Sequence, residues 1–269
     1  MSRSLKVAIS PCPNDTFAWG PLILGEVPSR LPLHFIYADI EELNHLAQQE
    51  AADVIKLSFF QYALLPRRKY RLLPIGAALG YGAGPLLVSR KPLSYEALQK
   101  AVIGIPGWHT TAYSLLRFFA PHAENLKAVL YSELMPSVNR GELDAAVIIH
   151  ESRFTYAEYG LTALIDLGAY WSEKTGYPVP LGGIAARREM PVRALVRGFR
   201  RSLRKAWREP SPALQALISS HAQEITPAVQ KSHIQLYVGP DTYRLSSTAR
   251  AAIRYYVHWV RSHPMLWKR

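Results

Sequence analysis

Short apolar runs rich in β-branched residues alternate along the chain with segments whose apolar positions recur at helical spacing. The first pattern is typical of buried strands and the second of amphipathic helices. The pattern predicts strands at residues 5–10, 33–38, 54–58, 102–106, 128–131 and 145–150, and extended segments at 85–90 and 181–186. It predicts helices from about Thr16 (capped by Asn14 or Asp15), at 40–50 after the cap Asp39, at 59–65, 94–101, 111–119 and 134–139, and from Pro191 onward. This alternation predicts an α/β fold with parallel sheets.

Two breaks interrupt the alternation. The glycine-rich stretch 80–85 follows the first three strand–helix units, and a second extended stretch at 181–187 precedes the helical C-terminal segment. A chain that crosses to a second lobe and returns would use such breaks as hinges. We therefore expect a first α/β lobe of residues 1–90 plus 186–269 and a second α/β lobe of residues 91–185. A ligand cleft is expected between the two lobes.

Polar residues stand where two expected strands of the first lobe end. Asp15 lies in the loop and helix start that follow residues 5–10, and Lys56, Leu57 and Ser58 end the strand at 54–58. Asn44, on the preceding helix, can face the same space as Ser58. Ligands of open α/β sheets bind beyond the carboxyl ends of the strands, so these residues are candidate ligand contacts. The alternative for Asp15 and Ser58 is that each simply caps a helix.

A helix start in the second lobe offers an anion site. Gly107 is followed by Thr110, Thr111 and Ala112 at the beginning of the helix expected at 111–119. Free backbone N–H groups and the positive end of the helix dipole favour a carboxylate or phosphate at such a position. The two threonine hydroxyls could add donors.

The apolar run 145–149 ends abruptly in His150. Histidine is the side chain whose ordinary pKa allows it to accept a proton near neutral pH. His150 is therefore a candidate general base at a strand end, and a packed structural histidine is the alternative.

Composition narrows the class of protein. The chain has 269 residues, of which 49% are hydrophobic, and Cys12 is the single cysteine, so no disulfide can form within the chain. Neither a secretory signal nor an apolar run of membrane-spanning length is visible, so we expect a cytoplasmic protein without stable membrane insertion. Weak self-association into a homo-oligomer is compatible with the sequence.

The net charge of +12 comes largely from one segment. Residues 187–208 contain nine Arg or Lys and one acidic residue, a net charge of +8. Apolar residues recur at helical spacing in the same segment, which indicates an amphipathic helix with a solvated basic face. An anionic partner or a membrane surface is the alternative. Because no base-reading motif accompanies the charge, we expect no nucleic-acid partner.

Several catalytic motifs are incomplete or absent. His150 and Glu151 begin like the zinc-protease helix, but the second histidine is missing. The glycines at 80–84 lack the last glycine of the dinucleotide fingerprint, and neither a phosphate-binding loop nor a nucleophile elbow occurs. We therefore expect a small-molecule site that needs no cofactor and no metal.

Four segments together resemble the 1,4-dihydroxy-6-naphthoate synthases, enzymes of menaquinone biosynthesis. They are SPCPNDTF at 10–17, KLS at 56–58, HTTAY at 109–113 and IIHESRFTY at 148–156, with further matches at 166–171 and 178–183. The resemblance runs from about residue 7 to 188 in order and spacing. It implies a two-lobed fold like that of type II periplasmic binding proteins.

The resemblance also implies an activity. The family's enzymes are lyases of the futalosine pathway that convert cyclic dehypoxanthine futalosine to 1,4-dihydroxy-6-naphthoate and a small ribose-derived polyol ketone, without cofactor or metal. Its proton-accepting histidine falls on His150. Its substrate-binding segments fall on Lys56–Ser58 and Thr110–Ala112, with Asp15, Asn44 and Arg153 as further matching positions. A non-catalytic binding protein for a small anion, with the same fold, is the alternative.

Overall fold

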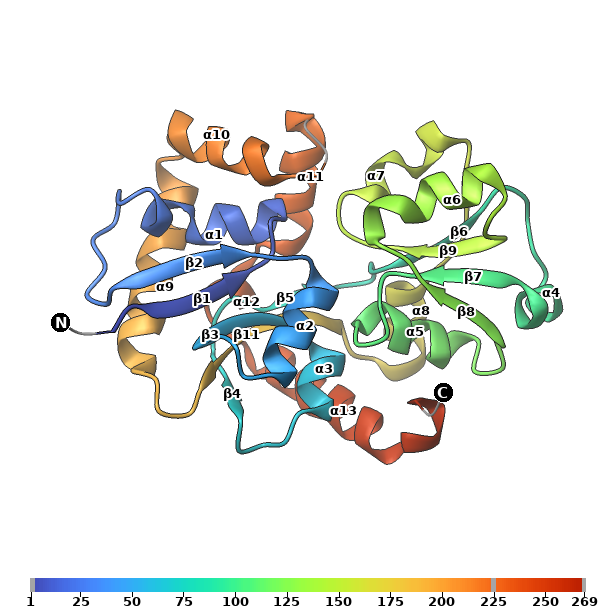
Figure 1. The fold of residues 1–269 in the computed structure, drawn as a ribbon, viewed down its shortest axis with the longest axis horizontal. Coiled ribbons are helices and arrows are strands. Elements are labelled where there is room, and N and C mark those ends of the chain that lie inside the picture. Colours follow the sequence, from blue (N-terminus) through green and yellow to red (C-terminus); the bar gives the residue numbers. More distant parts are fainter. Residues whose placement is uncertain (1–2, 224–225, 268–269) are drawn as a thin grey trace. The chain divides into compact units, whose positions relative to one another are not determined.

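A computed structural model describes residues 3–223 and 226–267 (Figure 1). The chain divides into two compact units, each of which contains one sheet. Unit 1 comprises the described residues up to Ser58, Leu65–Ala78 and Gly182–Arg250. Unit 2 comprises Phe59–Leu64, Leu79–Leu181 and the described residues from Ala251 onward.

The sheet of unit 1 is mixed. Its strands are β1 (Leu5–Ile9), β2 (Leu33–Tyr37), β3 (Val54–Ser58), β4 (Tyr70–Leu72), β5 (Ala78–Gly80) and β11 (Val179–Arg187). The order is β2-β1-β3-β11-β4, and β5 pairs with β11. β1 is parallel to β2 and β3, whereas β11 is antiparallel to β3 and β4. The carboxyl ends of β1 and β3 therefore lie at the same edge of the sheet.

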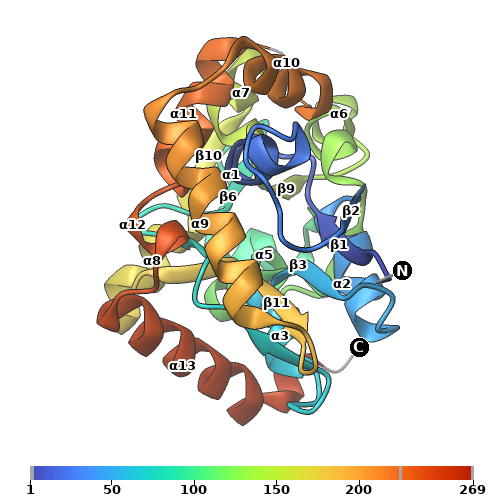
Figure 2. The ribbon, with the colours of Figure 1, turned by 90° about the vertical axis from the view of Figure 1, so that its left-hand side faces the viewer.

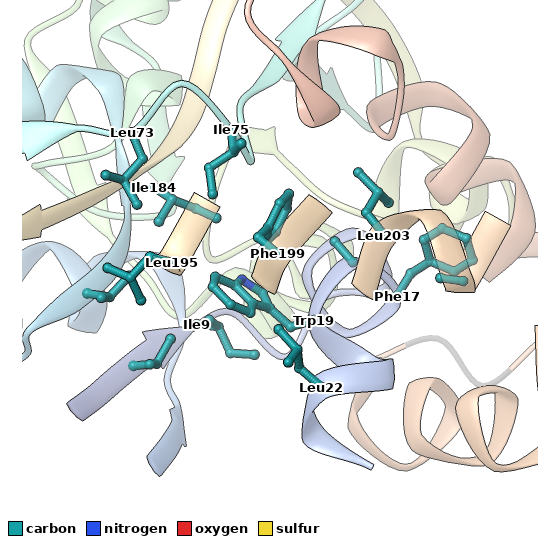
Figure 3. Close-up of a cluster of buried hydrophobic side chains, with 14 of the residues drawn as sticks. Ile9, Phe17, Trp19, Leu22, Leu73, Ile75, Ile184, Leu195, Phe199 and Leu203 are labelled. Atoms are coloured by element: carbon teal, nitrogen blue, oxygen red, sulfur yellow. The ribbon is translucent and has the colours of Figure 1, made fainter. Parts of the chain in front are cut away.

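Helices cover this sheet and close its core. They are α1 (Pro13–Ile23), α2 (Ile40–Gln48), α9 (Val192–Arg208), α10 (Pro212–His221), α11 (Pro227–Tyr237) and α12 (Pro240–Tyr243). Figure 3 shows side chains of α1 and α9 meeting side chains of the sheet. Trp19 of α1 is 1% exposed and lies edge-on to Phe199 of α9, with ring centroids 4.8 Å apart. The predicted amphipathic basic helix is confirmed, because Leu195, Phe199 and Leu203 on one face of α9 are buried.

The sheet of unit 2 is mixed as well. Its strands are β6 (Leu86–Ser89), β7 (Val102–Ile105), β8 (Asn125–Ala128), β9 (Ala145–Ile148) and β10 (Thr162–Asp166), in the order β10-β6-β9-β7-β8. β7 is parallel to β8 and β9, whereas β6 is antiparallel to β9 and β10. The carboxyl ends of β7 and β9 thus share one edge of this sheet.

The helices of unit 2 complete its core. They are α3 (Phe59–Leu64), α4 (Tyr95–Lys100), α5 (Thr111–Phe119), α6 (Leu134–Arg140), α7 (Ser152–Thr155), α8 (Leu167–Thr175) and most of α13 (Ser247–Ser262), with 3-10 turns η1 (Tyr131–Glu133), η2 (Tyr156–Tyr159) and η3 (Pro264–Trp267). α6 ends at Gly141, whose φ of +80° is the left-handed geometry that the expected stop requires. Figure 2 shows α13 as the long helix near the C-terminal end.

The structure corrects several expectations about individual elements. The strand predicted at 128–131 lies three residues earlier as β8, and residues 131–133 form η1. α1 begins at Pro13 with Cys12 as its cap position, so the prediction of a cap at Asn14 or Asp15 is wrong. The reason is that proline is favoured at the first helical position, where its missing N–H costs nothing. The expectation of parallel sheets is correct for the β1, β2, β3 and β7, β8, β9 pairings and wrong for β6 and β11, which run antiparallel to their neighbours.

The unit boundaries differ from the predicted lobes. The chain changes unit at 78/79 and 181/182, inside β5 and β11. β6 belongs to unit 2 because it pairs with β9 and β10, whereas residues 86–90 were expected in the first lobe. The described residues from Ala251 onward also group with unit 2, although the helical tail was expected to stay with the first lobe. None of the described helices has the length and apolar character needed to cross a membrane.

Candidate functional site

A buried ion pair links the ends of β1 and β3 in unit 1. Lys56 Nζ lies 2.9 Å from Asp15 Oδ1, and each side chain is 6% exposed. Lys56 also donates to the carbonyl oxygen of Gly76 at 3.3 Å, and the backbone N–H of Ser10 donates to Asp15 Oδ2 at 3.3 Å. Each charge therefore has a second polar partner, as burial of an ion pair requires. The pair fixes the loop after β1 against the end of β3.

A second contact fixes the end of β3 to α2. The side-chain oxygen of Asn44 accepts from the backbone N–H of Ser58 at 2.9 Å, and its amide nitrogen donates to the Ser58 hydroxyl at 3.2 Å. Asn44 is fully buried and Ser58 is 2% exposed. Lys56 and Ser58, two residues apart on a strand, point to the same face of the sheet. The structure thus brings Asp15, Asn44, Lys56 and Ser58 together at one sheet edge.

Leu57 differs from its neighbours. Its side chain is fully buried, and its backbone pairs with Gly183 of β11. A Cβ atom built on the adjacent Gly182 would lie 3.1 Å from Lys56 Cε and 3.3 Å from the Leu57 carbonyl oxygen. The glycine at 182 therefore allows β11 to approach the strand end closely.

In unit 2, the loop after β7 leads directly into α5. Gly107 has a φ of +149°, and the hydroxyl of Thr110 donates to its carbonyl oxygen at 2.8 Å. The same hydroxyl accepts from the backbone N–H of Tyr113 at 3.2 Å, so Thr110 caps the helix. Since a single cap satisfies one of the first-turn N–H groups, those of Thr111 and Ala112 remain at the open end of the helix dipole.

Thr111 joins three segments of unit 2. Its hydroxyl donates to the Leu181 carbonyl oxygen at 2.8 Å and accepts from the Phe60 backbone N–H at 3.3 Å. The Tyr256 hydroxyl of α13 contacts both Thr111 and Ser114, and burial raises the pKa of Tyr256 despite these contacts. Tyr256 and Ser114 were not among the predicted site residues. A buried tyrosine without a motif gives no signal in sequence.

His150 stands two residues beyond the last residue of β9, in a strained backbone conformation. Its φ is +57°, and Glu50 is the other non-glycine residue with positive φ in the described part of the chain. His150 is half-buried, and its imidazole lies edge-on to the ring of Tyr131, with ring centroids 5.1 Å apart. Left-handed conformations of non-glycine residues cluster at functional sites, where the surrounding structure enforces them. The strand predicted to run through His150 ends at Ile148 in the structure. His150 therefore lies in a turn, and this turn sets the position of its side chain.

Arg153 braces the turn after β9. Its guanidinium donates to the Gly84 carbonyl oxygen at 2.5 Å and pairs with Asp166 at 3.1 Å. Asp166 also caps α8 by accepting from the backbone N–H groups of Gly168 and Ala169. Arg153 thus has two internal partners, and its side chain is 18% exposed.

Comparison with known proteins identifies the family. The family model described as menaquinone biosynthesis matches residues 5–262. The chain belongs to the menaquinone biosynthesis family. It is 44% identical over 239 residues to a protein of Thermus thermophilus named 1,4-dihydroxy-6-naphthoate synthase, covering 88% of this chain and 86% of that one. A Streptomyces coelicolor protein of the same name is 41% identical over 261 residues, covering 93% and 90%.

Solved structures extend the likeness to the fold. A crystal structure of an Archaeoglobus fulgidus protein has a TM-score of 0.87 at 30% identity, with 98% of each chain covered. The alkanesulfonate-binding protein of Xanthomonas axonopodis has a TM-score of 0.69 at 10% identity, with 99% of this chain and 96% of that chain covered. The second likeness shows the fold alone. The chain therefore has the periplasmic-binding-protein fold that the resemblance implied.

Proposed function

We propose that this chain is a 1,4-dihydroxy-6-naphthoate synthase. It would act as a lyase that converts cyclic dehypoxanthine futalosine to 1,4-dihydroxy-6-naphthoate and a small ribose-derived polyol ketone, and it would need neither cofactor nor metal. The family and the names of two relatives at 41–44% identity support the proposal. The substrate, the products and the residue roles below are part of the proposal.

The observation that carries the proposal is the position of His150. A histidine, the residue type whose ordinary pKa lies near neutral pH, follows a fully buried strand and stands half-buried in a left-handed turn. We assign His150 as the general base that removes a proton from the substrate. Electrons then move toward the substrate carbonyl, the bond to the ribose-derived fragment breaks, and the bicyclic fragment aromatises. A positioned general base contributes about 10²–10⁴-fold in rate.

The start of α5 supports an anionic substrate. β7 and β9 are adjacent parallel strands, so residues 110–112 and His150 follow strand ends at the same edge of the unit 2 sheet. We assign the N–H groups of Thr111 and Ala112, and the cap residue Thr110, to a substrate carboxylate. Arg153 would hold the turn that carries His150.

The polar cluster of unit 1 would contribute a second set of substrate contacts. In this assignment Ser58 and Asn44 offer a hydroxyl and an amide, and Leu57 offers backbone groups beside Gly182. Lys56 and Asp15 neutralise each other, so they would hold the strand end in place while presenting little net charge.

The test is incubation of the purified protein with cyclic dehypoxanthine futalosine. The naphthoate product is detected by its ultraviolet spectrum and mass. We expect turnover by the wild-type chain, and a loss of about 10²–10⁴-fold in His150→Asn with substrate affinity within about tenfold. Asparagine is chosen because it tolerates the left-handed backbone. His34→Asn, at an exposed histidine of β2, is the matched control and should keep full activity.

A non-catalytic solute-binding protein is the competing function, because an alkanesulfonate-binding protein shares the fold. Tight binding of the futalosine-derived compound without any product would favour that function over the lyase. Full turnover by His150→Asn would keep the lyase and remove His150 as its base.

A further inference from the structure

The basic face of α9 borders a pocket that is independent of the sites described above. The pocket has a volume of about 220 Å³ and lies in unit 1, between α1, α9 and the loop at residues 28–31. Its apolar wall includes Trp19, Leu22 and Leu195, whose arrangement can be followed in Figure 3. Four arginines also line it, namely Arg30, Arg193, Arg197 and Arg201.

Three of these arginines form a stripe along α9. Arg193, Arg197 and Arg201 are four residues apart, so their side chains leave the same face at intervals of about 6 Å. Like charges at this spacing repel one another and destabilise a helix. Arg193 also lies in the first turn, where the helix dipole disfavours a positive charge. The stripe therefore costs the fold stability.

The positive charge of these four arginines is not balanced by nearby groups in the described part of the chain. Within residues 3–223 and 226–267, none of the four guanidinium groups has a hydrogen-bond or carboxylate partner. Other basic residues of the same helix differ. Arg200 and Arg204 lie over the ring of Tyr243, and Lys205 pairs with Glu209 at 2.5 Å. Among the described basic residues of α9 that precede Arg208, the three without such a partner all line the pocket.

Two local features border the pocket. The hydroxyl of Ser29 donates to the Leu31 carbonyl oxygen at 2.6 Å and accepts from the Leu31 N–H at 3.1 Å, which closes the loop that carries the exposed Arg30. Gly198 stands in the middle of α9, where glycine is less stable than alanine. A Cβ atom built there meets nothing nearer than Leu22 Cδ1, at 3.8 Å. The glycine is not required by crowding, and its effect is to leave space between the arginines.

We propose that this pocket binds a small amphipathic anion, with its apolar body against Trp19, Leu22 and Leu195 and its phosphate or carboxylate at the arginines. A volume of about 220 Å³ is below the usual range of roughly 300–1,000 Å³ for drug-sized ligands, so the body is of about single-ring size. The concave shape favours a free small molecule over a flat lipid surface. The proposal does not depend on the proposed lyase activity.

The experiment is calorimetric titration of the full chain with phenyl phosphate, with inorganic phosphate as the anion that lacks an apolar body. We expect phenyl phosphate to bind at least tenfold more tightly than inorganic phosphate. Arg197→Gln should weaken phenyl phosphate about tenfold or more, because a charge-assisted contact is lost. Arg208→Gln, at an exposed arginine of the same helix outside the pocket, is the matched control and should change nothing.

A second, independent test fills the pocket with a larger side chain at position 198. Gly198→Leu should abolish binding of phenyl phosphate, whereas Gly198→Ala should retain it and raise the thermal midpoint of unfolding. Equal affinity for both probes, or full phenyl phosphate binding by Arg197→Gln, would overturn the proposal. Binding only to vesicles that contain anionic phospholipid, with no response to phenyl phosphate, would overturn it in favour of a membrane surface.

Discussion

The Nζ atom of Lys56 lies 2.9 Å from the Oδ1 atom of Asp15, with both side chains 6% exposed. Forty-one positions separate the two residues in sequence, and the pair holds the loop after β1 against the end of β3. In a buried pair, loss of one partner leaves the other as an uncompensated charge. The relationship therefore makes the unit 1 strand end both rigid and sensitive to single substitutions.

Lys56→Met and Asp15→Asn should each lower the free energy of unfolding by about 3–5 kcal/mol. The double variant should recover a large part of this loss, because neither charge is then left alone. Urea unfolding followed by circular dichroism measures all three. Independent, additive losses in the double variant would mean that the two charges are not coupled in the folded protein.

The backbone at His150 should respond to side-chain type in a defined order. A φ of +57° is accessible to glycine and tolerated by asparagine, costs other residues about 1–2 kcal/mol, and is least favourable for β-branched residues. The free energy of unfolding should therefore fall in the order Gly, Asn, Ala, Val at position 150. The same series at Glu50, with a φ of +55°, should show the same order. Equal stability of the Gly and Val variants at 150 would show that this turn is not strained in solution.

The helix start at Thr110 and Thr111 shows how far local sequence can predict this site. A glycine followed by hydroxyl residues identified a capped helix start, and the structure contains that cap. The same pattern could not reveal that the Thr111 hydroxyl joins Phe60 and Leu181, because those contacts span 51 and 70 positions. The sequence therefore predicted the start of α5 but not the long-range hydrogen bonds that anchor it.

The strands show the same limit. Apolar runs located β1, β3, β7 and β9 to within two residues, since buried strands need such runs. The direction of β6 and β11 was not predictable from hydrophobicity, because parallel and antiparallel buried strands carry similar residues. The sequence also did not predict the left-handed turn at His150, because positive φ is uncommon for every residue except glycine.

Thr111→Val should weaken substrate binding more than it slows turnover. Valine keeps the shape but removes the acceptor for Phe60 and the donor to Leu181, so the first turn of α5 loses its external anchors. We expect KM for cyclic dehypoxanthine futalosine to rise about tenfold, with kcat within about threefold, because binding in the ground state and in the transition state is affected alike. Thr110→Ser, which keeps the cap hydroxyl, is the matched control. An unchanged KM in Thr111→Val would remove Thr111 from the substrate site.

Tyr256 should make the stability of the protein depend on pH in the alkaline range. Burial raises the pKa of its hydroxyl above the ordinary value of 10.0. Above that pH the unfolded chain loses the phenolic proton while the folded chain keeps it, so the unfolded state is favoured progressively. The contribution is fully present below pH 10 and is lost as pH rises through the unfolded pKa toward the folded one. Tyr256→Phe should therefore lose less stability than wild type between about pH 9.5 and 11.5, measured by urea unfolding.

Tyr62→Phe, at a half-buried tyrosine of the same unit, is the matched control for removal of a tyrosine hydroxyl, and its unfolding is measured over the same pH range. Tyr37 and Tyr70 also have raised pKa values through burial, so part of the alkaline loss of stability should persist in Tyr256→Phe.

The contact between the Tyr256 and Ser114 hydroxyls gives a second measurement, the stability at pH 8. Without the tyrosine hydroxyl, the buried Ser114 hydroxyl keeps only its bond to the Thr111 carbonyl oxygen, 2.8 Å long. Tyr256→Phe should therefore be less stable than wild type at pH 8, by about 1–2 kcal/mol, while the slope of its stability against pH is shallower. Identical slopes for Tyr256→Phe and wild type would mean that Tyr256 ionises in the folded protein as readily as in the unfolded chain.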